Sequence, residues 1–165
     1  MKIEIAVGDY VHLETWKKGD KLWSEWIEQD DEYKDIIKKL DAKEEILPAG
    51  EYHLVIDYPL SRPYRESITF ANPVKREEIV EIICNRYRKI YKLEDITSNI
   101  NPSGIICNRY RKTYKLEDIT SNINPRYNRV HTDGEYGIWG HDLSDLNLYT
   151  IYVDENKVIT LEVDS

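Results

Sequence analysis

A near-identical internal repeat is the feature that most constrains how this chain can fold. Residues 82–102 read IICNRYRKIYKLEDITSNINP, and residues 105–125 read the same except that Thr113 stands in place of Ile90. With their junctions, the copies form two segments of 23 residues, 82–104 and 105–127. Solenoid proteins stack three or more diverged units, so two near-identical copies in a non-repeating chain indicate a duplicated helix-loop segment instead. The sequence leaves open whether the duplication is natural or engineered.

The two copies compete for one helix position. Apolar residues recur at helical spacing from Pro73 to Asp95, which predicts a helix with Val80, Ile83, Tyr87, Ile90 and Tyr91 on its buried face. Copy 1 (82–104) keeps the residues that lead into this helix, 76–81, whereas copy 2 (105–127) follows a Pro-Ser-Gly sequence. Thr113 would also bury an unpaired hydroxyl group, at about 1–3 kcal/mol. We therefore expect copy 1 to occupy the helix position and copy 2 to be an inserted segment.

Copy 2 has an apolar strip of its own, formed by Ile106, Tyr110, Tyr114 and Leu116. An exposed strip of this kind is a candidate interaction surface. Exchange of identical elements between molecules is one route to a dimer. The strip therefore predicts a homodimer that forms through the duplicated segment.

Alternation of apolar and polar residues predicts strands in the rest of the chain. They cover residues 2–7, 51–60 and 65–70, followed by a C-terminal hairpin of 149–153 and 159–163. A second amphipathic pattern predicts a helix over residues 22–40. At 165 residues the chain is long enough for one domain, residues 1–165. We expect an α+β fold, with an antiparallel or mixed sheet and helices packed on one face.

The charge of the chain limits its partners. The net charge is −8, which opposes contact with a phosphate backbone, so we expect no nucleic-acid partner. Residues 82–126 carry nine Lys or Arg and four Asp or Glu, a net charge of +5 inside an otherwise acidic protein. We interpret this basic block as the duplicated polar face of one helix. An acidic body together with 13 Tyr and 4 Trp favours a protein partner, such as a basic protein.

The cysteines and the N-terminus indicate where the protein works. Cys84 and Cys107 occupy the same position in the two copies, so their even number does not indicate a disulfide. A buried, unreactive thiol within a helix fits a reducing compartment. The N-terminus lacks the apolar core of a signal peptide, and no apolar run reaches membrane-spanning length. These patterns predict a cytoplasmic protein with no membrane partner.

Reactive side chains gather between residues 129 and 145, RVHTDGEYGIWGHDLSD. Imidazole and carboxylate groups can bind a metal when they converge, and His131, His141 and Asp145 are the candidate ligands. No established metal-binding spacing matches them, so no cofactor is expected. The alternative is a turn-rich loop in which Asp and Gly serve the backbone and Asp142 or Ser144 begins a short helical turn. The candidate residues of this loop are His131, Asp133, Glu135, Trp139, His141, Asp142 and Asp145.

Three hypotheses follow for the function. The first is a non-enzymatic domain that binds another protein. The second is a metal-assisted hydrolase that uses the loop 129–145, with Asp145 as a ligand or base. The third is an engineered chain made to study sequence duplication. No glycine-framed serine or phosphate-binding glycine loop favours another enzyme class.

Overall fold

The structure is a computed structural model that describes residues 2–23, 31–32, 41–98 and 131–165. Most of the predicted helix 22–40 lies outside the described residues. So does all of copy 2, including its strip Ile106, Tyr110, Tyr114 and Leu116.

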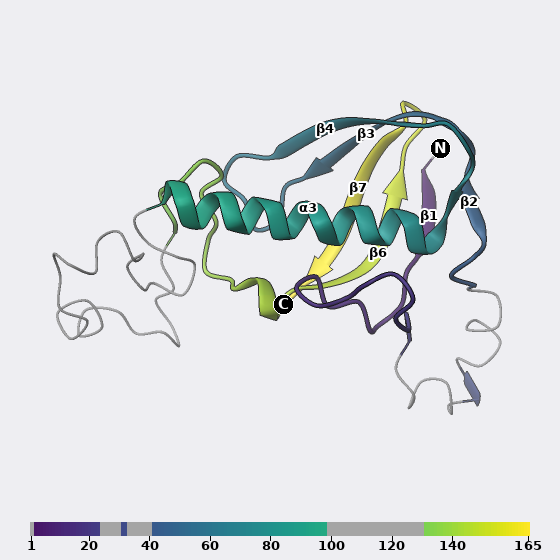
Figure 1. The fold of residues 1–165 in the computed structure, drawn as a ribbon, viewed down its shortest axis with the longest axis horizontal. Helices are drawn as coiled ribbons and strands as arrows, with labels where there is room; N and C mark the ends of the chain where they lie inside the picture. Colours follow the sequence, from purple (N-terminus) through teal and green to yellow (C-terminus); the bar gives the residue numbers. More distant parts are fainter. Residues whose placement is uncertain (1, 24–30, 33–40, 99–130) are drawn as a thin grey trace, which may run out of the picture.

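The described chain forms a five-stranded mixed sheet with a helix across one face, which confirms the predicted α+β class (Figure 1). The sheet has four pairs of neighbouring strands. All of them are antiparallel except β3 with β7, which is parallel. In spatial order the strands are β1 (Ile3–Ala6), β6 (Asn147–Val153), β7 (Val158–Asp164), β3 (Gly50–Ile56) and β4 (Tyr64–Phe70).

The strand predictions are confirmed within a few residues. The C-terminal hairpin forms as antiparallel β6 and β7, closed by a turn in which Asp154 accepts the backbone N–H of Val158 on Oδ1 at 2.9 Å. Residues 10–14 form no strand; there His12 makes one isolated bridge to Asn147. The sequence also did not indicate a small antiparallel sheet of β2 (Glu45–Leu47) and β5 (Val74–Lys75).

Helix α3 (Arg76–Thr97) lies along the sheet and contains the first part of copy 1. Pro73 was predicted to begin this helix, but Val74 and Lys75 are extended in β5, so the helix begins at Arg76. Its predicted apolar face is buried and packs with the inward side chains of the sheet. The core includes Tyr52, Leu54, Ile56, Val80, Ile83, Tyr87, Ile90, Tyr91, Ile151 and Ile159.

Two buried charged residues fix the first turn of α3. Arg76, 5% exposed, donates from Nε to the carbonyl oxygen of Ala6 at 3.1 Å and from Nη1 to Glu44 Oε2 at 3.0 Å. Glu77, 3% exposed, accepts from Nζ of Lys43 at 2.9 Å. These contacts use residues that precede the repeat, so the sequence of copy 2 has no equivalent of them.

Cys84 is fully buried in α3, as predicted for a packed thiol. Burial raises the pKa of the Cys84 thiol to about 12. The nucleophilic thiolate is therefore scarce at neutral pH. Within the described part of the chain, no helix has both the length and the apolar character that a membrane crossing requires.

Candidate functional site

The predicted loop meets the C-terminal end of α3 and the turn that follows β3 (Figure 1). Ile138 forms an isolated bridge with Leu60, and the backbone N–H of Trp139 donates to the carbonyl oxygen of Pro59 at 3.0 Å. The backbone N–H of Thr132 donates to the carbonyl oxygen of Ile138 at 2.7 Å, which closes the loop on itself. Residues 131–139 are thus held between two elements that are distant in the sequence.

A buried carboxylate anchors the loop to the helix. Glu94 is 0% exposed, and its Oε1 accepts from the Thr132 hydroxyl at 2.7 Å and from the Gly137 backbone N–H at 3.1 Å. Its Oε2 accepts from the Tyr136 backbone N–H at 2.9 Å. Hydrogen bonds to an ionised carboxylate are stronger than those between neutral groups. Glu94 therefore fixes the path of the backbone that leads to Trp139.

Trp139 is the centre of an aromatic cluster that also contains Tyr58, His131 and His141. The indole ring stacks on the His131 imidazole, with 6.4 Å between centroids. It makes edge contacts with Tyr58 at 5.3 Å and with His141 at 5.7 Å. The Tyr58 hydroxyl and Nε2 of His141 are hydrogen-bonded at 3.1 Å. Trp139 nevertheless stays 37% exposed, so part of this residue faces solvent.

Two glycines on either side of Ile138 and Trp139 allow this turn. Gly137 has φ of 64° and Gly140 has φ of 67°, in the left-handed region that glycine adopts most readily. Both glycines therefore let the backbone turn sharply on either side of Ile138 and Trp139.

The three predicted metal ligands are not assembled into a site. Among residues 2–23, 31–32, 41–98 and 131–165, no group of three or more His, Cys, Asp or Glu side chains could hold a metal ion. The His131 and His141 rings each contact the indole of Trp139, and Nε2 of His141 bonds to Tyr58. The two imidazoles thus take part in the aromatic cluster.

Other predicted residues support the loop. Ser98 donates from its hydroxyl to Asp133 Oδ1 at 2.7 Å. Glu135 takes part through its backbone, which donates to the Thr97 hydroxyl at 3.0 Å and accepts from Nε of Arg62 at 2.6 Å.

Asp142 precedes the short helix η2 (Leu143–Asp145) as its N-cap residue, without a side-chain cap hydrogen bond. The backbone N–H of Asp145 donates to the carbonyl oxygen of Asp142 at 3.0 Å.

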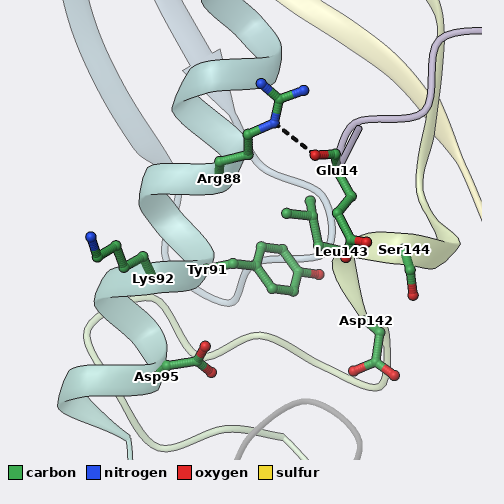
Figure 2. Close-up of a pocket in the computed structure, with 8 residues that line it drawn as sticks. All are labelled: Glu14, Arg88, Tyr91, Lys92, Asp95, Asp142, Leu143 and Ser144. Atoms are coloured by element: carbon green, nitrogen blue, oxygen red, sulfur yellow. Dashed lines mark hydrogen bonds between the residues drawn. The ribbon is translucent and has the colours of Figure 1, made fainter. Parts of the chain in front are cut away.

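An open pocket lies beside the loop, between α3, the N-terminal segment and η2 (Figure 2). We call it the α3 pocket; its volume is about 400 Å³. The Tyr91 ring extends from α3 into it, and the Tyr91 hydroxyl donates to the carbonyl oxygen of His141 at 2.7 Å. This bond connects the pocket to the aromatic cluster. The pocket is lined by Glu14, Arg88, Tyr91, Lys92, Asp95, Asp142, Leu143 and Ser144.

The α3 pocket carries charges of both signs, from the acidic Glu14, Asp95 and Asp142 and from the basic Arg88 and Lys92. The guanidinium of Arg88 donates from Nε to the carbonyl oxygens of Leu13 at 3.1 Å and Glu14 at 2.9 Å, so it anchors the N-terminal segment (Figure 2). Burial raises the pKa of Asp95, and the nearby carboxylates of Glu94 and Asp142 raise it further. A cation placed between Asp95 and Asp142 would relieve this repulsion.

The sequence did not reveal several of these residues. Tyr58 follows a strand and carries no motif, and Glu94 has the appearance of a solvent-facing helix residue. Tyr91 was predicted only as part of the core. Their roles depend on contacts with residues about 40 or more positions away, for which short-range patterns carry no signal.

Comparisons of the chain with models of protein families, with curated proteins and with solved structures found no match. The site must therefore be interpreted from its own geometry.

Proposed function

We propose that this chain is a non-enzymatic domain that binds another protein through Trp139 and the adjoining α3 pocket. The observation that carries the proposal is the exposure of Trp139, which is 37% exposed although rings contact it on several sides. Tryptophan and tyrosine are enriched among residues that dominate binding energy. A ring that is already held in place loses little conformational entropy when a partner binds.

The α3 pocket favours a basic partner. Its acidic side chains, Glu14, Asp95 and Asp142, outnumber its basic ones, Arg88 and Lys92, and the guanidinium of Arg88 already bonds to backbone carbonyls. A lysine or arginine of the partner would enter beside Asp95 and Asp142 while an apolar side chain covers Trp139. The net charge of −8 would speed the encounter with a basic protein. We place this activity in the cytoplasm, without a nucleic acid or a cofactor.

Replacing Trp139 with alanine is expected to weaken capture of the partner at least about tenfold, as for other central aromatic residues in interfaces. The measurement is quantitative affinity capture from cells that express the chain, with wild-type and Trp139→Ala protein as baits. Tyr10→Ala is the matched control, because Tyr10 is an exposed aromatic residue (46%) outside the site. The comparison requires that the wild-type and Trp139→Ala proteins have equal thermal stability. If both baits then recover every captured protein equally, the proposal is contradicted.

We further propose that copy 1 occupies the native helix position and that copy 2 mediates self-association through Ile106, Tyr110, Tyr114 and Leu116. The contacts of Arg76 and Glu77 support the first part, because only copy 1 follows these residues.

Deletion of residues 103–125, which joins Pro102 to Arg126, is expected to leave the melting temperature unchanged and to convert a dimer into a monomer. Light scattering and thermal unfolding of both chains measure this. A full-length chain that is already monomeric would exclude the dimer. A deleted chain that unfolds at a clearly lower temperature would show that copy 2 stabilises the domain.

A further inference from the structure

The face of the sheet opposite α3 carries a second cavity, of about 440 Å³. It is lined by His53, Leu54, Val55, Arg65, Glu66, Ser67 and Val158. In the β3–β4 ladder His53 pairs with Ser67 and Val55 with Arg65. The inward neighbours of these residues, Leu54 and Ile56, are buried, so alternation places the four paired side chains on the outward face.

Arg65 supplies a positive charge that no partner among the described residues compensates. The described arginines are Arg62, Arg65, Arg76, Arg86 and Arg88. Within the described ranges, every one of them except Arg65 donates to a carbonyl or carboxylate oxygen. The neighbouring carboxylate of Glu66 is held by Nη2 of Arg86 at 3.0 Å and by the Tyr64 hydroxyl at 2.8 Å. The Glu66 side chain therefore lies on the face of the sheet that packs against α3, away from Arg65.

His53 and Ser67 line the same cavity as Arg65. Nδ1 of His53 and the Ser67 hydroxyl are hydrogen-bonded to each other at 3.0 Å, so one donor is used within the pair and the other group can still donate to a ligand. The Glu51 carboxylate lies 4.0 Å from Nε2 of His53. In the part of the chain that the structure describes, no carboxylate pairs with Arg65. Val55 and Val158, both half-buried, add an apolar surface.

We infer that this cavity binds a small organic oxyanion, a carboxylate or a phosphate monoester, attached to an apolar group. The guanidinium of Arg65 has the planar, two-donor geometry that such anions prefer. The hydrogen-bonded pair of His53 and Ser67 adds a second donor, and the apolar part of the ligand covers Val55 and Val158. This site lies on the face of the sheet opposite α3 and does not depend on the proposed protein partner.

The test is a titration of the ¹⁵N-labelled full chain with phenyl phosphate, benzoate and inorganic phosphate, followed by amide chemical shifts. We expect saturable shifts at residues 53–55, 65–67 and 158 with one of the two aromatic anions, and weaker binding of inorganic phosphate. Which aromatic anion binds more tightly identifies the anion class.

Arg65→Gln is expected to weaken that binding roughly tenfold or more, because it removes a charge-assisted hydrogen bond. Lys18→Gln is the matched control, since it removes a positive charge from an exposed turn outside the cavity. Unchanged binding by the Arg65→Gln protein would overturn the inference. So would shifts that do not saturate or that occur equally over the whole surface. Equal binding of inorganic and phenyl phosphate would overturn the role of the two valines.

Discussion

The Glu94→Ala protein is expected to lose about 3–5 kcal/mol of unfolding free energy, as when one member of a buried charged network is removed. Glu94 is fully buried and accepts hydrogen bonds from the Thr132 hydroxyl and from the backbone N–H groups of Tyr136 and Gly137. Alanine would leave these three donors without their acceptor. A buried donor that loses its partner costs more than the bond itself contributed.

Urea denaturation followed by circular dichroism measures this loss. Glu81→Ala is the matched control, because Glu81 is a partly exposed glutamate on the same helix and its replacement should change stability by no more than about 0.5 kcal/mol. A second control is Glu94→Gln, which keeps one acceptor oxygen and should have an intermediate effect. If Glu94→Ala is no more destabilising than Glu81→Ala, the carboxylate is not what holds the loop to α3.

Over their aligned residues, 82–102 and 105–125, the two copies differ only in Ile90 and Thr113. Replacing each of these residues with the other type should change the unfolding free energy by unequal amounts. Ile90→Thr is expected to lower the unfolding free energy by about 2–3 kcal/mol, through lost apolar volume and a buried hydroxyl. Ile90 is 0% exposed beneath the sheet, so no water can reach a hydroxyl placed there. The converse change, Thr113→Ile, should alter stability by less than about 0.5 kcal/mol if copy 2 lies outside the core.

The pair of variants tests which copy fills the helix position. The double exchange, Ile90→Thr with Thr113→Ile, keeps the amino-acid composition of the wild-type chain, so composition cannot account for its effect on stability. Denaturation of the two single variants and of the double exchange measures the difference. A neutral Ile90→Thr change together with stabilisation by Thr113→Ile would assign the helix position to copy 2 instead.

Local patterns predicted the elements that depend on neighbouring residues. The β6–β7 hairpin follows from alternation on both sides of a short polar turn, and the buried face of α3 follows from its 3.6-residue period. The small β2–β5 sheet was missed, because three residues paired with two across a long connection produce no periodic signal. The start of α3 was placed too early because Val74 and Lys75 pair with β2 as strand β5 and do not join the helix.

For the candidate site, the sequence singled out the segment 129–145 but not the residues of other elements that contact it. His131, Trp139 and His141 were recognised as unusual, and they do lie together. The alternative in which His131, His141 and Asp145 bind a metal finds no support among the described residues, where no group of three or more His, Cys, Asp or Glu side chains could hold a metal ion. The two imidazole rings contact Trp139 instead. The neighbour Tyr58 comes from a turn more than 70 residues earlier in the chain.

The amino-acid sequence by itself determined the duplication, the acidic charge, the main strands and the amphipathic face of the long helix. These properties depend on composition or on contacts between residues close in the chain. Only the tertiary structure decided that Glu94 is buried rather than solvated, that Trp139 is a fixed and partly exposed ring, and that Arg65 lacks a partner among the described residues. Burial and pairing depend on which distant segments pack together, and side-chain alternation and helical periodicity contain no information about those pairings.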